Sequence, residues 1–260
     1  ITGTGGLDTN YSFTFVNTGL LSVTKATLTG TTQNATREYG LANPTFTINY
    51  TGFRNADTVA VVTTAATLTA GTTLTSNVGD YAVTASGANA TNYQFVYVDS
   101  GLLSITKATV TATSQNATRE YGAADPTFAF NYTGFRNGET SAVIDTLATA
   151  TPAATVTSSV GTYGIAGSAA SDNNYTFIYT DSGILTITKA MLTATTQNAT
   201  REYGLANPTL SVVYTGFRNG DDDLDLTALA TATTGANVFS DVGSYGISST
   251  GATDDNYNFT

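Results

Sequence analysis

The sequence predicts a mainly β fold, built as a tandem array of small immunoglobulin-like β-sandwich modules. Three observations support this fold class. Thr and Tyr, which favour strands, and Gly, Asn and Asp, which favour turns, are abundant, whereas charged residues make up only 11% of the 260 residues. Apolar and polar residues alternate in short runs, as in half-buried strands. The same motifs also recur at a constant spacing, which indicates repeated modules.

The repeat has a period of 82 residues. The motif Arg-Glu-Tyr-Gly begins at Arg37, Arg119 and Arg201, and Tyr-Thr-Gly-Phe-Arg, Val-Gly-Xaa-Tyr and Asn-Tyr recur with the same offset. This length is typical of a small independent domain. We predict four segments: residues 1–24, the C-terminal strands of a preceding repeat; residues 25–106 and 107–188, two complete repeats; and residues 189–260, a repeat that lacks its last strand. Because Ile1 lies within a motif, we expect the chain to be a piece of a longer protein.

Within residues 25–106 the pattern predicts six or seven short strands. Phe46, Ile48 and Tyr50 alternate with polar residues, as in a half-buried strand. Other strands are expected at residues 26–34, near residues 72–75, and at residues 81–85 and 93–97, while residues 35–44 are expected to form a connection that carries Arg-Glu-Tyr-Gly. The turn at residues 99–101 predicts a hairpin between the strand before it and the strand after it.

The segment that differs most between the repeats predicts one short helix in each module. Its versions at residues 56–66, 138–148 and 220–230 each have an acidic residue near the start, followed by apolar residues at helical spacing. These acids are Asp57, Glu139 and Asp221, and we interpret them as the helix start. Short strands with one helix also fit a β-grasp-like module, which remains the alternative to the sandwich.

Residues 102–112 join two repeats without a flexible linker. Leu103 and Ile105 are apolar at odd positions, whereas Ala108 and Val110 are apolar at even ones. Because side chains alternate between the two faces of a strand, this change of phase takes the chain out of one hydrophobic core and into another. The only lysines of the chain stand at this module junction in each repeat: Lys25, Lys107 and Lys189.

The three lysines allow two interpretations. In the first, which we favour, each lysine marks the change of phase and keeps its amine in water. In the second, the amine forms an intramolecular isopeptide bond with an Asn side chain, assisted by a buried carboxylate such as Glu38.

Composition argues against several classes of function. A net charge of −10 and a pI near 4.1 make the chain a poor partner for nucleic acid or for an anionic membrane surface. No apolar run is long enough to span a bilayer. Without Cys and His, the chain lacks the commonest metal ligands and nucleophile–base pairs. We therefore expect no enzyme activity, no catalytic residues and no cofactor.

The charged residues suggest ion pairs and one acidic cluster. Arg37 and Glu38 point to opposite faces of a strand, so we expect partners elsewhere in the module, with Arg37 or Arg54 meeting Glu38 or an acid such as Asp57. The dense acidic cluster consists of Asp221, Asp222, Asp223 and Asp225. We interpret it as the acidic first turn of the short helix, and we keep a calcium site as the alternative.

Aromatic residues gather on one strand of the repeat. Tyr93, Phe95 and Tyr97 share one face of that strand. We assign this face to the hydrophobic core rather than to a platform for binding sugars.

Taken in order, the motifs resemble the MBG repeat domains of bacterial surface proteins. They are an opening Lys-Ala-Thr-Leu-Thr, then Tyr-Gly, Asn-Pro-Thr, Tyr-Thr-Gly-Phe, Val-Gly-Xaa-Tyr, Asn-Tyr and a closing Gly-Leu-Leu-Ser-Ile-Thr-Lys. The resemblance is to the type marked by Tyr-Gly, here at Tyr39, Tyr121 and Tyr203, and it covers the whole chain. Such domains occur in tandem in large secreted adhesins, including filamentous-haemagglutinin-like proteins. The resemblance implies an extracellular location, at the bacterial cell surface or in a secreted matrix.

Two functional hypotheses follow. The preferred one is a structural stalk of a bacterial adhesin, whose rigid tandem repeats project an adhesive region for attachment or biofilm formation. The alternative is that each repeat binds carbohydrate weakly and gains by avidity. The expected partners are neighbouring repeats of the same chain, identical chains or extracellular polysaccharide, and the ligand is unknown. We also expect residues 1–24 to be able to supply the strand that residues 189–260 lack, in another copy.

Overall fold

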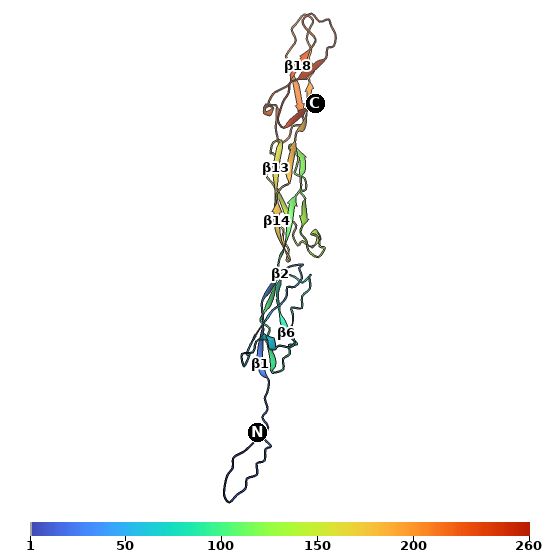
Figure 1. Cartoon of the computed structure of the whole chain (residues 1–260). Helices are drawn as coiled ribbons and strands as arrows, with labels where there is room; N and C mark the ends of the chain where they lie inside the picture. Colours follow the sequence, from blue (N-terminus) through green and yellow to red (C-terminus); the bar gives the residue numbers. More distant parts are fainter. Residues whose placement is uncertain (1) are drawn as a thin grey trace. The chain divides into compact units, whose positions relative to one another are not determined.

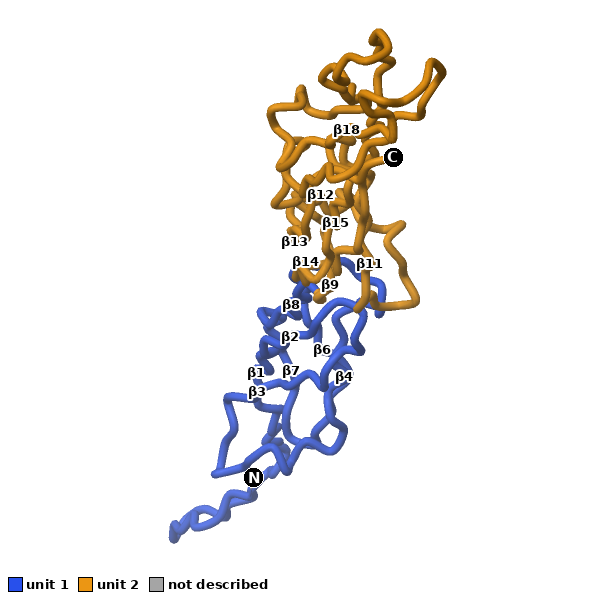
Figure 2. Tube along the Cα trace, turned by 90° about the horizontal axis from the view of Figure 1, so that it is seen from above, with its two compact units in different colours: residues 1–107 blue, residues 108–260 orange. Residues whose placement is uncertain are grey.

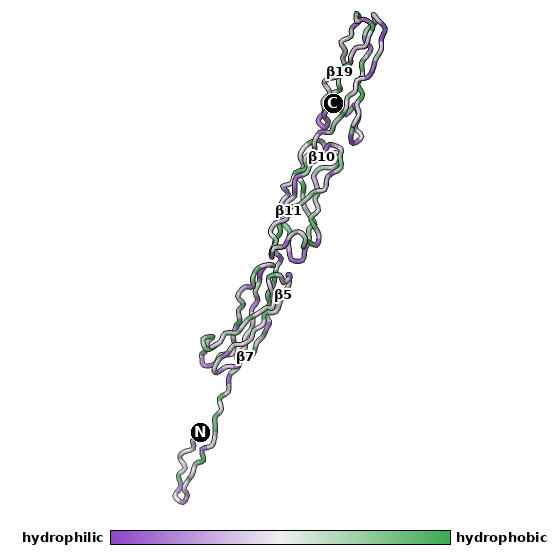
Figure 3. The backbone as a smooth tube through the Cα atoms, turned by 90° about the vertical axis from the view of Figure 1, so that its right-hand side faces the viewer, coloured by the Kyte–Doolittle hydropathy of each residue, from purple (hydrophilic) through white to green (hydrophobic). Residues whose placement is uncertain are grey.

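A computed structural model of the chain describes residues 2–260 and confirms the mainly β fold class. Twenty strands and three short 3-10 helices follow one another along the described residues (Figure 1). The chain divides into two compact units, residues 1–107 and 108–260 (Figure 2). Hydrophobic and hydrophilic residues follow one another in short stretches along the trace (Figure 3). Within the described part of the chain, no helix has the length and apolar character that a membrane crossing requires.

The first sheet of unit 1 has the strand order β3-β1-β7. It contains β1 (Ala26–Thr32), β3 (Ile48–Thr51) and β7 (Tyr93–Val98). The central strand β1 is antiparallel to β3 and parallel to β7, with Leu28 opposite Phe95. Leu28 is fully buried, because alternate residues of β1 point into the core.

The second sheet of unit 1 has the strand order β2-β8-β5. It contains β2 (Ala35–Glu38), β5 (Gly79–Ala82) and β8 (Leu102–Thr106), and the strands β4 (Thr67–Thr69) and β6 (Thr84–Ser86) pair beside it in a two-stranded sheet. The chain therefore passes from one sheet to the other between β1 and β2. The expectation that residues 35–44 form only a connection is wrong for β2, which pairs in parallel with β8.

The predicted hairpin at residues 99–101 is also wrong. The strands on its two sides, β7 and β8, belong to different sheets, so the turn is a crossing between sheets. Gly101 allows this crossing, because a Cβ atom there would lie 2.5 Å from the carbonyl oxygen of Gln33. Its amide donates to Thr32 Oγ1 at 2.9 Å, and its carbonyl accepts from the amide of Val83 at 2.8 Å.

Unit 2 begins with a repeat of the same design. One sheet has the order β11-β9-β14, and the other has the order β10-β15-β13-β12. The strands are β9 (Ala108–Ser114), β10 (Ala117–Glu120), β11 (Phe130–Thr133), β12 (Thr149–Pro152), β13 (Gly161–Ser168), β14 (Tyr175–Thr180) and β15 (Ile184–Thr188). The closing strand β15 lies between β10 and β13, parallel to the first and antiparallel to the second.

The next repeat of unit 2 has fewer strands. Its sheets have the orders β17-β16-β20 and β18-β19. The strands are β16 (Ala190–Thr196), β17 (Val212–Thr215), β18 (Thr231–Thr234), β19 (Ile247–Thr250) and β20 (Tyr257–Phe259). Residues 199–202 and 243–246, whose counterparts in the preceding repeat pair with β15, are not in strands. Residues 2–24 also contain no strand, so their assignment to a preceding repeat, like the other repeat boundaries, stays a prediction.

The change of phase at the junction is confirmed. Leu185 and Ile187 in β15 are buried at odd positions, and Ala190 and Leu192 in β16 are buried at even ones, with only Lys189 between the two strands. In the same way, the buried residues of β8 lie at odd positions and those of β9 at even ones. The buried positions therefore change from odd to even between two successive strands of one continuous segment. The expectation of two separate cores is wrong at Lys189, because the buried side chains on its two sides belong to one hydrophobic cluster.

The short helices are 3-10 helices of three residues each: η1 (Val59–Val61), η2 (Ser141–Val143) and η3 (Asp223–Asp225). Their N-caps are Thr58, Thr140 and Asp222, whose side chains each accept from a backbone amide of the helix. The acids predicted to start the helices lie one residue earlier and have another role, described below. A β-grasp-like module needs a helix packed across its sheet, and residues 2–260 form no such helix, so the sandwich-like arrangement holds.

Candidate functional site: the joint between two repeats

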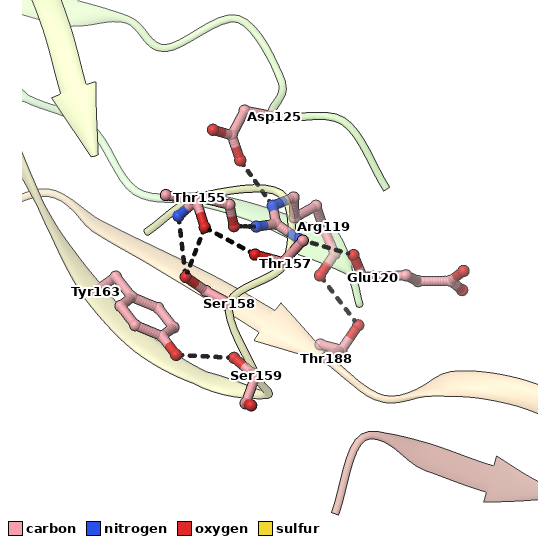
Figure 4. Close-up of polar contacts among 9 residues, drawn as sticks. All are labelled: Arg119, Glu120, Asp125, Thr155, Thr157, Ser158, Ser159, Tyr163 and Thr188. Carbon is pink, nitrogen blue, oxygen red and sulfur yellow. Dashed lines mark hydrogen bonds and ion pairs between the residues drawn. The ribbon is translucent and has the colours of Figure 1, made fainter. Parts of the chain in front are cut away.

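A buried arginine organises one end of the repeat at residues 107–188. Strand β10 directs Arg119 inward, where its side chain is 2% exposed. Nε donates to Asp125 Oδ1 at 2.6 Å, Nη1 to the Glu120 carbonyl at 3.2 Å, and Nη2 to the Thr155 carbonyl at 2.6 Å (Figure 4). The guanidinium therefore ties the loop after β10 to the loop before β13.

The same clamp recurs in the other repeats. Arg37 donates to Asn43 Oδ1 at 2.8 Å and to the Glu38 and Thr73 carbonyls at 3.1 and 2.7 Å. Arg201 donates to the corresponding groups of Asn207, Glu202 and Asn237. Arg37 thus donates to one side-chain amide oxygen and to two backbone carbonyls, and the pairing of Arg37 or Arg54 with Glu38 or an acid such as Asp57 stays a prediction. A carboxylate enters the clamp where Asp125 stands in place of asparagine.

The clamped loop of residues 153–160 is held by further short contacts. The Thr155 amide donates to Ser158 Oγ at 2.9 Å, and Tyr163 Oη donates to the Ser159 carbonyl at 2.9 Å (Figure 4). On the other side, Thr188 Oγ1 donates to the Arg119 carbonyl at 3.3 Å. Hydrogen bonds within this repeat therefore hold the loop and the neighbouring strands at its end in place.

Tyr121 follows the clamp directly and lies at the joint with the next repeat. Its amide donates to the Thr188 carbonyl at 2.9 Å, which extends the pairing of β10 with β15. Its ring is 6% exposed and meets the ring of Tyr257 edge to face, with centroids 5.5 Å apart. Its hydroxyl donates to Asp221 Oδ2 at 3.1 Å. Residues about 100 positions apart in the sequence thus meet through one tyrosine.

Asp221 receives a second tyrosine from its own repeat. Tyr257 Oη donates to Asp221 Oδ2 at 2.7 Å and accepts from the Arg218 amide at 2.8 Å. The equivalent bonds within the other repeats join Tyr93 to Asp57 at 2.7 Å and Tyr175 to Glu139 at 2.5 Å. The prediction that Asp57, Glu139 and Asp221 begin the helices is therefore wrong, because each acid accepts from the tyrosine of the Asn-Tyr motif.

Gly122 permits the close approach of the two repeats. Its φ is +71°, and a Cβ atom there would lie 2.4 Å from Cβ of Arg218. The Val160 amide also donates across the joint, to Asn256 Oδ1 at 2.9 Å. The Tyr-Gly motif and the Val-Gly-Xaa-Tyr motif of one repeat thus contact the Tyr-Thr-Gly-Phe-Arg and Asn-Tyr motifs of the next.

One hydrophobic cluster spans the joint. Its buried members include Leu185 and Ile187 from one repeat and Leu192, Leu226 and Tyr257 from the next. Because these side chains pack together, separating the two repeats would expose apolar surface from both.

Burial shapes the electrostatics of the joint. Burial raises the pKa of Tyr257 above its usual range; the hydrogen bond with Arg218 opposes this rise and the Asp221 carboxylate adds to it. Burial also raises the pKa of Tyr121, where a hydrogen bond from Asn219 opposes the rise and Asp221 again adds to it. Both hydroxyls therefore stay protonated and able to donate to the carboxylate at neutral pH.

The lysines of the junctions bind backbone rather than side-chain groups where the structure gives their partners. Lys25 Nζ donates to the Ala90 carbonyl at 2.9 Å, and Lys189 Nζ donates to the Asp254 carbonyl at 2.6 Å. The favoured interpretation expected each amine to lie in water. Both amines instead donate to a backbone carbonyl, and neither donates to an asparagine side chain. Lys107 occupies the same sequence position between β8 and β9.

The acidic cluster caps η3. Asp222 accepts from the Leu224 amide at 2.8 Å, and Asp225 accepts from the Asp222 amide at 2.9 Å, which forms a capping box. Asp223 is the first residue of the helix. Residues 2–260 contain no group of three metal-ligating side chains. Calcium binding by Asp221, Asp222, Asp223 and Asp225 stays a prediction.

The aromatic face of β7 points toward the core. Tyr93 is buried, and Phe95 and Tyr97 are half-buried, whereas Val96 and Val98 on the other face are exposed. Tyr93 meets Phe53 edge to face at 5.9 Å. The assignment of this face to the core is confirmed.

Sequence reasoning missed both the arginine clamp and the tyrosine joint. The available signal was the repeated pairing of Arg with Asn or Asp six residues later, at Arg37, Arg119 and Arg201. The joint had only a weaker signal, the recurrence of Tyr-Gly without an apolar run beside it. Neither pattern indicates which distant residues the arginine or the tyrosine contacts.

Comparison with known proteins gives one match. The family model described as MBG domain (YGX type) matches residues 28–103, 108–186 and 192–260. No curated protein matches the chain, and no solved structure does.

Proposed function

Because the chain belongs to the family of MBG domains of the YGX type, we propose that it is a stalk segment of a secreted or surface-anchored bacterial adhesin. In this role the repeats catalyse no reaction, as expected of a structural repeat family, and project an adhesive region for attachment or biofilm formation. The proposal places the chain outside the cell, at the cell surface or in a secreted matrix.

The joint within unit 2 carries this proposal. A stalk needs repeats that do not bend freely at their connections, and a single residue, Lys189, separates β15 from β16. The edge contact between Tyr121 and Tyr257 contributes about 0.5–1.5 kcal/mol, and the hydrogen bond from Tyr121 to the Asp221 carboxylate contributes about 1.5–3 kcal/mol. A joint stabilised by about 3 kcal/mol is open in fewer than about one molecule in a hundred.

A distance measurement across the joint tests the proposal. The chain has no cysteine, so Thr133→Cys and Thr231→Cys, at exposed positions on β11 and β18, provide two unique sites for spin labels. Double electron–electron resonance is expected to give one narrow distribution of distances. A broad distribution in this doubly labelled chain would contradict a stalk.

A pair of matched variants links the result to the joint. Tyr121→Ala removes the contact with Tyr257 and Asp221 and is expected to broaden the distribution. Tyr203→Ala changes the equivalent tyrosine of the next repeat, which is 66% exposed, and is expected to leave the distribution unchanged.

A further inference from the structure

The two ends of a repeat lie side by side as parallel strands. In the repeat at residues 107–188, the first segment, residues 108–120, contains β9 and β10, and the last segment, residues 175–188, contains β14 and β15. Strand β9 pairs in parallel with β14 through six pairs of facing residues, and β10 pairs in parallel with β15 through four. The first and last segments therefore run in the same direction through both sheets of the repeat.

The repeat in unit 1 has the same arrangement. Its first segment contains β1 and β2, and its last segment contains β7 and β8. Strand β1 pairs in parallel with β7 through six pairs of facing residues, and β2 pairs in parallel with β8 through four. Parallel pairing of the two ends is therefore a feature of the repeat and not of a single copy.

Hydrogen bonds also join the two segments where they cross from one sheet to the other. Ser114, at the end of β9, is buried, and its Oγ accepts from the Gly183 amide at 2.8 Å. Asn116 Oδ1 accepts from the Ile184 amide at 2.9 Å. A Cβ atom at Gly183 would lie 2.7 Å from the Gln115 carbonyl oxygen, so glycine permits the close approach of the two backbones. The crossing therefore connects the two blocks of strand pairs.

The outermost backbone bonds continue the pairing at both ends of the segments. Where the first segment begins, the Ala108 amide donates to the Asn174 carbonyl at 3.0 Å. Just after it ends, the Tyr121 amide donates to the Thr188 carbonyl at 2.9 Å. The two equivalent bonds of unit 1 are each 2.9 Å long. Hydrogen bonds therefore join the first and last segments along their whole length.

The chain enters and leaves the repeat through these two segments. A single residue, Lys107, separates β8 from β9, and a single residue, Lys189, separates β15 from β16. Tension along the chain therefore pulls the first segment toward its N-terminus and the last segment toward its C-terminus. Because the two segments are parallel, this tension makes them slide past each other, and it loads all the hydrogen bonds between them at the same time.

The other pairings of the repeat lie outside this load path. Two antiparallel strands that are pulled apart at one end lose their pairs of bonds one after another, so they separate at a lower force. In this repeat the antiparallel pairs, β9 with β11 and β15 with β13, connect the two segments to residues 121–174. These residues lie between the segments in the sequence, so they receive tension only after the segments have separated.

We infer that the repeats at residues 25–106 and 107–188 are tension-bearing units, whose parallel end segments resist unfolding when the chain is pulled lengthwise. The inference rests on the proposed stalk for the source of the tension, because a stalk that links a cell to a surface is pulled when the two move apart. The resistance itself is a property of one repeat, since both segments belong to the same repeat.

Two directions of pulling on the same repeat test the inference in the full chain. The chain has no cysteine, so Thr109→Cys with Thr188→Cys provides attachment points near the two ends of the load path. Thr109→Cys with Thr176→Cys is the control, because these residues face each other and their separation peels the edge strand β14 from β9. All three positions are exposed. Full extension between the attachment residues is about 270 Å in the first chain and about 230 Å in the second, which identifies the repeat that unfolds.

Optical tweezers measure the unfolding force of both chains at one loading rate. We expect the first direction to need about twice the force of the second or more, because the bonds between the segments break together in the first and one after another in the second. Thr188→Cys removes a bond of 3.3 Å to the Arg119 carbonyl, so this change only lowers the force in the first direction. Equal forces in the two directions would overturn the inference.

A matched pair of variants tests the crossing between the sheets. Ser114→Ala removes the acceptor of the Gly183 amide and is expected to raise the unfolding rate at a fixed force about tenfold in the first direction. In the second direction peeling starts at residue 109, so the rate should change less than about twofold. Thr113→Val, on the opposite face of β9, removes a hydroxyl as well and should leave both rates unchanged. Equal acceleration in both directions by Ser114→Ala would overturn the role of the crossing.

The combined outcomes separate this inference from the proposed stalk. A narrow distribution of spin-label distances together with equal unfolding forces would overturn the inference alone. A broad distribution together with a force that depends on direction would contradict the stalk alone.

Discussion

Residues 115–122 and residues 197–204 have the same sequence, Gln-Asn-Ala-Thr-Arg-Glu-Tyr-Gly, and different structures. The first copy contains strand β10, and its tyrosine is 6% exposed. The second copy forms no strand, and its tyrosine is 66% exposed. The difference lies in the surroundings. Strand β15 lies beside the first copy and the next repeat lies beyond it, whereas residues of the second copy line an open groove.

This comparison separates what a repeat builds by itself from what a neighbour supplies. The arginine clamp forms in both copies, because its partners belong to the same repeat. The strand and the buried tyrosine form only where β15 and the next repeat provide hydrogen bonds and apolar contacts. The arginine side chain therefore makes the same contacts in both copies, whereas the backbone and the tyrosine side chain differ between them.

Removing the clamp should give the largest effect. Arg119→Ala leaves Asp125 and the Thr155 carbonyl without a buried donor and is expected to lower the free energy of unfolding of its repeat by about 3–5 kcal/mol. Arg201→Ala, at a half-buried position with an asparagine partner, should cost only about 1 kcal/mol. Hydrogen exchange measured by mass spectrometry reports each repeat separately. Equal losses in the two repeats would show that burial does not govern the strength of the clamp.

A methyl group at the Tyr-Gly motif tests the joint more directly. Gly122→Ala brings Cβ against Cβ of Arg218 and is expected to cost about 2–4 kcal/mol, from overpacking together with a positive φ. Gly204→Ala has a φ of +84° and no atom within 4 Å of the new Cβ, so strain of about 1 kcal/mol is expected.

Thermal unfolding monitored by calorimetry compares the two glycine variants. The spin-label distances across the joint should broaden for Gly122→Ala alone. If both variants lose the same stability, the approach of Arg218 is not what requires a glycine at residue 122.

The two tyrosines of the joint are expected to give the smallest effect on the free energy of unfolding at neutral pH. Their effect grows as the pH rises. An unfolded tyrosine loses its proton near pH 10, whereas burial raises the pKa of Tyr121 and Tyr257 in the folded chain. Above about pH 10 the folded state therefore binds more protons than the unfolded state, so the free energy of unfolding falls as pH rises. Below about pH 10 the contribution of both groups is complete.

Urea unfolding followed by circular dichroism between pH 8 and pH 12 measures this dependence. Tyr257→Phe should make the fall at high pH shallower, and Tyr203→Phe, at an exposed position, is the control. An alkaline profile that Tyr257→Phe leaves unchanged would mean that other groups control it.

Much of the repeat was predictable because its signals are local. The alternation of Tyr93, Phe95 and Tyr97 predicts both a strand and the face that it buries, and β7 has both. The change of phase between Ile187 and Ala190 predicts that the buried positions change from odd to even there, and they do. These predictions need only the two-residue periodicity of a strand, which any reader of the sequence can count.

The wrong predictions concern partners that are distant in the sequence. The turn at residues 99–101 has the composition of a hairpin, but β7 and β8 pair with strands of different sheets. Asp221 is an acidic residue at the position expected for a helix start, but its carboxylate accepts from Tyr257 and Tyr121. In each case several partners were chemically acceptable. The fold decides among them, because it determines which distant segments of the chain lie beside the residue.

The sequence by itself determined the modular organisation of this protein: a repeat of 82 residues, the apolar face of its strands and the change of phase at each junction. Only the tertiary structure decided that Arg-Glu-Tyr-Gly is a strand followed by a joint in one repeat and an exposed loop in the next. The physical reason is that a strand needs hydrogen bonds from another strand, and a buried tyrosine needs a surface to cover it. For residues 115–122 those partners lie more than 60 positions away in the chain, in β15 and at Asp221 and Tyr257.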